Sequence, residues 1–545
     1  MSETLTDTLS PPRTDEARAY IQNPILRGFN PDPSIVRVEN DFYIATSTFE
    51  WFPGVQLHHS RDLVHWRLVG RALDRRSQLD MIGNPDSGGV WAPHLSYADG
   101  LFYLIYTDVK TWGVREPFKD AHNYLVTAPD ICGPWSEPVY LNSSGFDPSL
   151  FHDVDGRKWL LNMIWDHRKG KNPFGGILLQ EFDPAAGELV GPVHNIFRGT
   201  HLRVTEGPHI VRKDGFYYLL TAEGGTTYEH AVTLARSKTL TGPYEVHPDN
   251  PLLTSRGRPE LELQKAGHGS LVETQTGEWY LAHLCGRPLS PLGRCNLGRE
   301  TALQRLEWPR GDWPRLAGGD NAPKLQVPAP ALPAHPFPPE NERDDFDAPT
   351  LSPHWQTLRV PHDESWLSLR ERPGFLRLRG RESLISRHRQ SLVARRLQAH
   401  VAEAETCVEF EPETFQQMAG LVAFYQANNW VYLRLSRDEV LGKSLNILTC
   451  DHSVYDEALD EDVSVEGAAR VFLKVRFERE TFRFAYATEP GAWREVGPRF
   501  DAGKLSDDYC QGLSFTGTFI GLCAQDLSGR RRHADFDYFS YREDA

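Results

Sequence analysis

A chain of 545 residues is long enough for three or four average domains, although single β folds often run longer. Its 59 Lys and Arg residues against 74 Asp and Glu give a net charge of −15, which argues against a partner with a phosphate backbone. No apolar run approaches the roughly 18 residues of a membrane span. We therefore expect neither nucleic acid nor a membrane as a partner.

The first 22 residues form a polar N-terminal segment without the basic and then apolar pattern of a secretory signal. The seven cysteines are an odd number, are widely spaced, and form neither a CxxC metal motif nor a disulfide framework. Both features favour a reducing compartment. We expect a cytoplasmic protein.

Five segments share one pattern, in which an extended run and a polar turn precede an aromatic-rich strand. They cover residues 32–45, 92–105, 147–161, 206–220 and 268–282. Their register is marked at intervals of about 60 residues by Tyr43, Tyr103, Trp159, Tyr218 and Tyr280. Asp-Gly turns such as Asp99-Gly100 are typical of hairpins. A four-stranded unit repeated five times predicts a five-bladed β-propeller.

The repeats stop after Trp308, and seven prolines follow in the 17 residues from Pro323 to Pro339, as expected for a semi-rigid connector. Beyond it, apolar and polar residues alternate without the repeat, which predicts a β-sandwich. The expected fold is all-β. The expected organisation is a polar segment (1–22), a catalytic propeller (23–318), a Pro-rich linker (319–343) and a sandwich that closes the active site (344–545).

Innermost propeller strands surround a central axis, so equivalent positions near their starts point to one place. Counting back from the register aromatics gives Asp32, Asp147, Glu206 and His268. Acidic residues before proline can also simply cap turns, which is the alternative for Asp32 and Asp147. Paired carboxylates facing a sugar are the groups that glycoside hydrolysis needs. Motifs for phosphate loops, dinucleotides, zinc proteases and serine hydrolases are absent from the sequence.

Five longer motifs carry a family resemblance: GFNPDPSIV (28–36), SGGVWAPHLSY (87–97), FDPSLFHD (146–153), TEGPHI (205–210) and LGRETALQ (297–304). They resemble the two-domain β-xylosidases of glycoside hydrolase family 43, from about Asn23 to the C-terminus. That family's fold, a five-bladed propeller and a β-sandwich, agrees with the repeat count. One departure is His94, where close relatives usually carry Asp.

The resemblance implies roles for the charged residues. Asp32 matches the general base that takes a proton from the attacking water, and Glu206 matches the general acid that protonates the leaving oxygen. Asp147 matches a third carboxylate that orients the acid and raises its pKa. Arg299 resembles a guanidinium that holds sugar hydroxyls, although a surface salt bridge is the commoner role of an arginine.

The resemblance also implies a binding pocket. Phe49, Trp91, Trp165 and Thr226 resemble its wall around the terminal sugar. Phe515 resembles a sandwich residue that closes the pocket and makes the enzyme exo-acting. His268 resembles an axial histidine near a water cluster or a Ca²⁺ ion, which it would contact through water; the alternative is a hydrogen-bonded core histidine. The pair His58-His59 is expected on a strand surface.

The expected activity is that of an exo-β-xylosidase. It would release D-xylose from the non-reducing ends of β-1,4-xylooligosaccharides with inversion of configuration, with no required cofactor and as a homo-oligomer. Two alternatives stay open. One is α-L-arabinofuranosidase activity, as the main or a side reaction. The other is a carbohydrate-binding propeller without hydrolytic activity, which would need no general acid.

Overall fold

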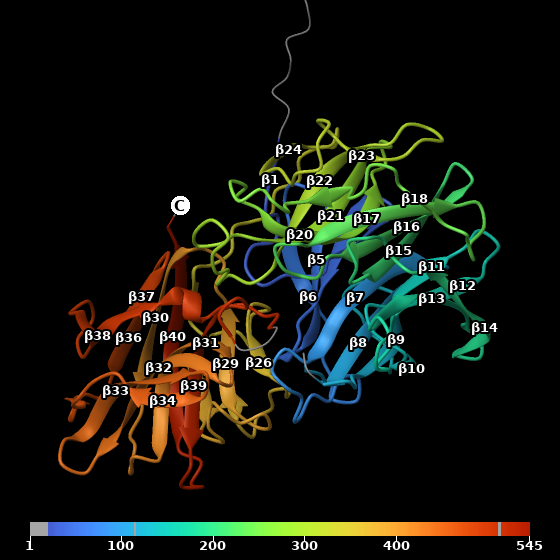
Figure 1. The fold of residues 1–545 in the computed structure, drawn as a ribbon. Helices are drawn as coiled ribbons and strands as arrows, with labels where there is room; N and C mark the ends of the chain where they lie inside the picture. The colour runs from blue at the N-terminus through green and yellow to red at the C-terminus, as the bar shows by residue number, and fades with distance from the viewer. Residues whose placement is uncertain (1–19, 114–115, 511–513, 545) are drawn as a thin grey trace, which may run out of the picture.

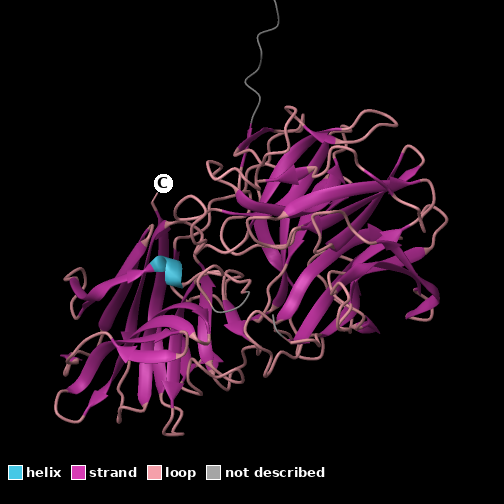
Figure 2. Ribbon diagram, in the orientation of Figure 1, coloured by secondary structure: helices cyan, strands magenta, loops and turns pink. Residues whose placement is uncertain are grey.

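The computed structural model describes residues 20–113, 116–510 and 514–544. They form two all-β bodies, shown side by side in Figure 1. Within these ranges the one helical element is the 3-10 turn η1 (Ala502–Lys504), coloured cyan in Figure 2. None of the described helices has the length and apolar character required to cross a membrane. The predicted all-β fold class is confirmed.

The larger body is a five-bladed propeller whose blades each begin with a strand at the axis. Blade one consists of β2 (Ser34–Val38), β3 (Asp41–Thr46), β5 (Gly54–Ser60) and β6 (Arg67–Leu73). Blade two consists of β7 (Gly89–Ala98), β8 (Leu101–Thr111), β9 (Asp120–Ala128) and β10 (Val139–Asn142). Blade three consists of β11 (Ser149–His152), β12 (Lys158–Trp165), β13 (Phe174–Asp183) and β14 (Glu188–Phe197). Blade four consists of β15 (Glu206–Lys213), β16 (Phe216–Glu223), β17 (Ala231–Ser237) and β18 (Glu245–Val246), with β19 (Leu253–Thr254) beside β17. Blade five consists of β20 (Gln264–Glu273), β21 (Trp279–Gly286), β22 (Glu300–Glu307) and β23 (Arg315–Leu316).

The hairpins between the first two strands of several blades follow from their turn residues. In blade two, Asp99 and Gly100 join β7 to β8 with φ of 53° and 79°. Asp214 and Gly215 do the same in blade four, with φ of 50° and 78°. Positive φ at both central residues matches the right-handed twist of the strands, and Asp followed by Gly adopts it at low cost. Local chemistry therefore sets the first hairpin of these blades.

The smaller body is a β-sandwich of two antiparallel sheets. One sheet contains β25 (Arg343–Asp344), β27 (Leu367–Ser368), β28 (Leu376–Arg379), β30 (Val401–Glu409), β36 (Val471–Glu478), β37 (Thr481–Ala487), β38 (Arg494–Asp501) and β40 (His533–Glu543). The other contains β26 (Gln356–Leu358), β29 (Ser391–Arg396), β31 (Gln417–Gln426), β32 (Asn429–Asp438), β33 (Gly442–Asp451), β34 (Val454–Glu457), β35 (Val463–Ser464) and β39 (Phe519–Asp526). Along β37, buried and partly exposed residues alternate, as half-buried strands require.

The two bodies share a sheet. A short strand from the propeller, β4 (Trp51–Phe52), pairs with β26 at the edge of the second sandwich sheet. Trp51 is fully buried and stacks on Phe519 of β39, with ring centroids 3.7 Å apart. The aromatic core therefore runs from the propeller into the sandwich, and it holds the sandwich against one end of the propeller.

The proline-rich segment also packs against the propeller. Its strand β24 (Gln326–Pro328) pairs with β1 (Tyr20–Gln22) near the N-terminal end of the described chain. Val327 is 2% exposed and lies in a cluster with Ile21 and Ile35. The proline-rich segment therefore packs along the surface of the propeller and is not a free spacer.

Candidate active site

The five innermost strands place one residue each at an equivalent position beside the axis. The register aromatics pair with Val36, Ser96, Phe151, Val211 and Val272. The residue four positions before each of these partners is, in blade order, Asp32, Ala92, Asp147, Gly207 and His268. All five have φ between 33° and 57°, although four of them are not glycine. Such left-handed conformations cost energy and concentrate at functional sites.

In blade four, the pairing of β15 with β16 shows that the position expected from the sequence is wrong by one residue. Gly207 is the equivalent residue, and Glu206 directly precedes it. A side chain at Gly207 would be strained at its φ of 57°, and its Cβ would lie 3.0 Å from the ring of His268. The glycine therefore lets blade four come close to the axis with Glu206 beside it.

Asp32, Asp147 and Glu206 nonetheless line one small cavity, together with Arg299 and His268. Asp32 is held on both carboxylate oxygens. Ser47 Oγ donates to its Oδ2 over 2.7 Å, and Arg299 Nη1 donates to its Oδ1 over 2.9 Å. These two contacts fix the position and orientation of the Asp32 carboxyl group, as a general base requires.

Asp147 and Glu206 favour their protonated forms. Burial raises the pKa of Asp147 to about 8, with the negative charge of Asp32 adding to the effect and Arg299 opposing it. Burial, followed by the charges of Asp147 and Asp32, raises the pKa of Glu206 well above the usual range of a carboxyl group. A protonated carboxylic acid opposite an ionised one is the pairing used for acid and base catalysis.

Arg299 joins the two bodies at the cavity. In addition to Asp32, its Nη1 contacts Thr226 Oγ1 at 3.2 Å, and its Nη2 donates to the backbone oxygen of Phe515 at 3.2 Å. Arg299 Nε is buried and has no hydrogen-bond partner among the described residues. The other end of the guanidinium is engaged by protein atoms of both bodies, which fixes its position beside the cavity.

Aromatic rings form the rest of the cavity wall. Phe515, from the sandwich, lies with its ring centroid 5.7 Å from that of Phe49 and 5.4 Å from that of Trp91. Phe146 also lines the cavity, and the ring of Trp91 meets it edge-on at 5.4 Å. Phe146 stands in the FDPS motif directly before Asp147, yet the sequence prediction omitted it. Such rings offer apolar faces to the C–H surface of a sugar.

Trp165 lies outside the set of residues that line this cavity. Its ring is next to that of Phe146, at 6.2 Å between centroids, and its Nε1 donates to the backbone oxygen of Pro117. Lys119 Nζ lies over the same ring at 4.3 Å. The remaining residues predicted for the pocket wall, Phe49, Trp91, Thr226 and Phe515, all line the cavity.

His268 lies with its Nδ1 3.9 Å from Asp32 Oδ1. Burial lowers its pKa, and its nearest ring neighbour is His209, edge-on at 6.3 Å. Among the described residues, no group of three or more His, Cys, Asp or Glu is arranged to hold a metal ion. Since Ca²⁺ takes six to eight oxygen ligands, the residues around His268 do not fit a calcium site built from protein groups.

The unusual His94 has a structural contact. Its Nδ1 accepts a hydrogen bond from the backbone N–H of Leu150 over 3.3 Å, which links blade two to blade three. Burial lowers the pKa of His94 to about 3. The ring is therefore neutral at physiological pH and adds no charge below the carboxylates.

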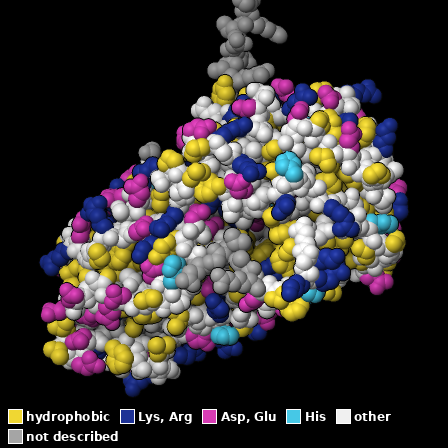
Figure 3. All heavy atoms as spheres, viewed as in Figure 1, with side chains coloured by type: hydrophobic (Ala, Val, Ile, Leu, Met, Phe, Trp, Pro, Cys, Tyr) yellow, Lys and Arg dark blue, Asp and Glu magenta, His cyan; other side chains and the backbone are white. Residues whose placement is uncertain are grey.

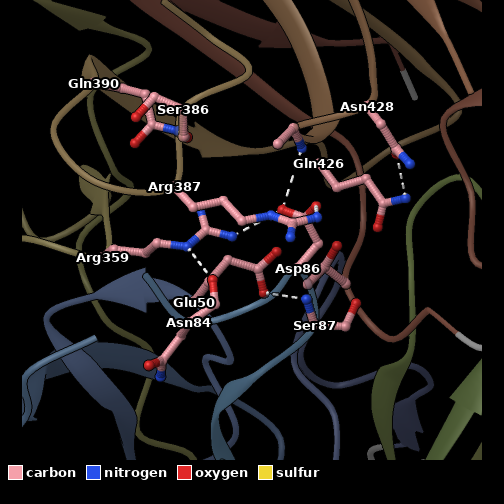
Figure 4. A network of polar contacts seen from close by, with 12 residues as sticks. Glu50, Asn84, Asp86, Ser87, Arg359, Ser386, Arg387, Gln390, Gln426 and Asn428 are labelled. Atoms are coloured by element: carbon pink, nitrogen blue, oxygen red, sulfur yellow. Dashed lines mark hydrogen bonds and ion pairs between the residues drawn. The ribbon is translucent and has the colours of Figure 1, made fainter. Parts of the chain in front are cut away.

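A polar network between the two bodies supports the cavity wall (Figure 4). Arg359 of the sandwich is fully buried; its Nη2 donates to Asp86 Oδ1 over 2.8 Å, and its Nε donates to the backbone oxygen of Asn84. Next to Asp86, Ser87 Oγ accepts from the backbone N–H of Phe515, and Ser87 O accepts from Trp91 Nε1. The network therefore fixes two of the cavity's rings.

Figure 4 also shows the buried Glu50, which directly follows Phe49 in the chain. Its Oε2 accepts from the backbone N–H of Ser87 over 3.1 Å, and burial raises its pKa to about 7. No sequence pattern indicated this network, because its members are distant in the chain and stand in no repeated motif.

Three buried carboxylates of contrasting protonation, a guanidinium and an aromatic wall at the axis of a propeller define the active site of a glycoside hydrolase. Residues 21–314 match glycosyl hydrolases family 43, and residues 343–542 match the beta-xylosidase C-terminal concanavalin A-like domain. The chain belongs to glycosyl hydrolases family 43.

Named relatives cover almost the whole chain. A beta-xylosidase of Bacillus subtilis (strain 168) is 52% identical, over 96% of this chain and 99% of its own. A xylan 1,3-beta-xylosidase of a Vibrio species is also 52% identical, with the same coverage. The crystal structure of xylan beta-1,4-xylosidase from Bacillus halodurans C-125 is 61% identical, covers 96% of this chain and all of its own, and superposes with a TM-score of 0.94.

Proposed function

We propose that this protein is an exo-acting β-xylosidase that removes D-xylose from the non-reducing ends of β-1,4-xylooligosaccharides. The observation that carries the proposal is the single cavity in which Asp32, Asp147 and Glu206 meet under the ring of Phe515. The beta-xylosidase names of similar proteins support the same conclusion, and the 61% identical structure favours the 1,4 linkage.

In the proposed mechanism, the carboxylate of Asp32 takes a proton from a water molecule, which attacks the anomeric carbon. The protonated carboxyl of Glu206 donates its proton to the glycosidic oxygen as the C–O bond breaks. Burial keeps Glu206 protonated, and the negative charge of Asp32 adds to the effect. A single displacement of this kind inverts the configuration, and it requires a separation of about 6.5–9.5 Å between the carboxyl groups of Asp32 and Glu206.

Closure by the sandwich is the proposed origin of the exo specificity. Phe515 is 8% exposed and holds its place through backbone bonds to Ser87 and Arg299. A cavity closed on that side accepts the end of a chain, and not its middle. Arg299, which lines the cavity, would bind hydroxyls of the terminal sugar.

Other properties stay predictions from the sequence: cytoplasmic location, assembly as a homo-oligomer, and hydrolysis without a required cofactor. Acidic and basic side chains are interspersed over the face shown in Figure 3, which is unfavourable for a nucleic acid partner. Any Ca²⁺ near His268 would be held mainly by water.

A panel of substrates tests the proposal. We expect release of xylose from 1,4-β-xylobiose, and from the non-reducing end of xylotetraose labelled at its reducing end. A higher rate on 1,3-β-xylobiose would replace the linkage assignment, and a higher rate on 4-nitrophenyl α-L-arabinofuranoside would establish the alternative activity. Binding of xylobiose without hydrolysis would reduce the protein to a carbohydrate-binding propeller.

A further inference from the structure

Ser47 takes no part in the steps of the proposed mechanism, although it contacts the carboxyl group of the general base. In blade one, the pairing of β2 with β3 sets Ser34 opposite Ala45. The same register continued by two residues sets Asp32 opposite Ser47, and the backbone N–H of Ser47 donates to the oxygen of Pro31 over 3.2 Å. Ser47 is fully buried and is not among the residues that line the cavity. Its hydroxyl therefore contacts Asp32 without contacting a bound sugar.

The hydroxyl of Ser47 has two partners, and together they fix the direction of its proton. The backbone N–H of Ala92 donates to Ser47 Oγ over 2.8 Å, and Ser47 Oγ donates to Asp32 Oδ2 over 2.7 Å. A backbone N–H can only donate, so Oγ is the acceptor in the first of these bonds. The one hydrogen of the hydroxyl is then committed to the carboxyl oxygen. Blade two thus orients a hydroxyl of blade one toward the general base.

The backbone donor comes from the residue of blade two that occupies the same axial position as Asp32. Ala92 has no functional side chain, yet its φ is 33°. Left-handed backbone at a residue other than glycine costs energy and persists where the surrounding structure requires it. The pairing of β7 with β8 is irregular between Trp91 and His94, so Ala92 has no partner in β8, and its N–H reaches Ser47 instead. The unusual backbone of Ala92 therefore supplies the bond that holds Ser47.

The matching position opposite Asp147 carries no hydroxyl. In blade three, the backbone N–H of Met163 donates to the oxygen of Phe146 over 3.1 Å, which is the same bond that the residue opposite Asp32 makes in blade one. A thioether has no hydrogen to donate. Asp147, which takes no proton from water in the proposed mechanism, therefore lacks a side-chain donor from the opposite strand. The hydroxyl accompanies the carboxyl group that is assigned as the base.

The contact with Ser47 matters because one hydrogen bond does not fix a carboxyl group. The terminal torsion of an aspartate is broad, so a carboxyl group held through one oxygen can rotate. Arg299 holds Oδ1 of Asp32 over 2.9 Å, and in the described part of the chain Ser47 is the one hydrogen-bond partner of Oδ2. His268 Nδ1 lies 3.9 Å from Oδ1, which is too far for a hydrogen bond. Without the hydroxyl, Arg299 alone would orient the carboxyl group.

We propose that Ser47 is a positioning residue for the general base: its hydroxyl, held by the backbone N–H of Ala92, keeps the carboxyl group of Asp32 turned toward the attacking water. The inference rests on the proposed function, in which Asp32 takes a proton from that water. Catalysis of this kind depends on alignment, and a displacement of about 1 Å can lower a rate about 10²-fold. Because Ser47 lies outside the cavity lining, it acts on the rate and not on the affinity for the sugar.

The test compares Ser47→Ala with a change at a serine that joins the same two blades but contacts no carboxyl group. Ser34 is 1% exposed, and its Oγ accepts from the backbone N–H of Leu95 in blade two over 2.9 Å. Ser47→Ala and Ser34→Ala each leave one buried N–H of blade two without this partner, so both should show a similar decrease in Tm. The measurements are kcat and KM on 1,4-β-xylobiose and on 4-nitrophenyl β-D-xyloside, and the inhibition constant of D-xylose.

We expect Ser47→Ala to lower kcat about 10–100-fold, with KM and the inhibition constant of D-xylose unchanged. The loss should be similar on both substrates, because the hydroxyl acts on the side of the attacking water and not on the leaving group; this separates the variant from Glu206→Gln. Ser34→Ala should keep the original kcat. Ser47→Cys, whose thiol is a weaker donor, should have an intermediate kcat, and it carries the test if Ser47→Ala does not fold.

An unchanged kcat in Ser47→Ala, or in Ser47→Cys where Ser47→Ala does not fold, would overturn the inference. A parallel loss of affinity for D-xylose, or an equal loss of kcat in Ser34→Ala, would overturn it too, because either result would indicate a general structural role. Retention of activity in Asp32→Ala, measured in the same assay, would contradict the proposed mechanism itself. The failure of the inference and the failure of the proposed function are therefore distinguishable.

Discussion

Asp147→Asn should stabilise the ligand-free protein at neutral pH while it impairs catalysis. Asp147 is 7% exposed, and burial together with the charge of Asp32 raises its pKa from 3.8 to about 8. A carboxyl whose pKa is higher in the folded state stabilises the fold only while it is protonated. The stabilisation that this bound proton provides is complete below pH 3.8. It decreases as the pH rises from 3.8 and is fully lost once the pH has passed about 8.

The size of the effect follows from that shift. At pH 7 the unfolded chain has released this proton and the folded chain retains it. The ceiling on the cost is about 4 kcal/mol, from 1.36 kcal/mol per pH unit above the unfolded pKa. Asparagine needs no proton, although it loses the attraction between a carboxylate and Arg299. We therefore expect a rise in Tm of about 2–5 °C at pH 7.

The assay is thermal unfolding of both proteins between pH 4 and 8 without substrate. The variant should be more stable at neutral pH, and its Tm should depend less on pH. A matched control is Asp535→Asn, because Asp535 is also buried, but its ion pair with Arg377 at 2.7 Å outweighs burial and its pKa is lowered. Loss of that ion pair should lower Tm. An Asp147→Asn protein with unchanged or lower Tm and the original pH dependence would refute this reasoning about the carboxylates.

Further predictions concern catalysis and ligands. Glu206→Gln should reduce the rate on xylobiose by about 10²–10⁴-fold and the rate on an aryl xyloside with a good leaving group far less; equal losses would count against Glu206 as the acid. Glu223→Gln, a change at a buried glutamate outside the cavity, is its control and should not alter the dependence on the leaving group. Phe515→Ala should raise KM for xylobiose several-fold with both bodies folded, and unchanged kinetics in a folded variant would remove its closing role. Exhaustive chelation should leave activity intact if His268 is a hydrogen-bonded core histidine; a loss restored by Ca²⁺ would show that an ion held through water matters.

The propeller could be predicted because its information is local and repeated. Turn residues such as Asp99 and Gly100 fix the hairpins, and one aromatic per blade keeps the register. The three carboxylates were found through the same repeats. Their alignment was one residue off at Glu206, because blade four has the same short hairpin as blades one and two, so its equivalent residue lies 11 rather than 12 residues before Tyr218.

The contacts between the bodies could not be predicted, because nothing local encodes them. Arg359 and Asp86 are 273 residues apart, and their bond exists only once the sandwich has docked. His58 has the alternating context of a surface strand and is buried by the sandwich. Trp165 was assigned to the pocket wall through the family resemblance, but it contacts the ring of Phe146 and is not among the residues that line the cavity.

The most direct test of the account is the configuration of the first sugar released. Proton NMR during hydrolysis of 1,4-β-xylobiose distinguishes the anomers before mutarotation mixes them. A water activated by Asp32 and a proton donated by Glu206 predict α-xylose as the first product from the non-reducing end. Initial formation of β-xylose would mean that Asp32 attacks the sugar itself, and it would contradict the roles assigned here to both carboxyl groups.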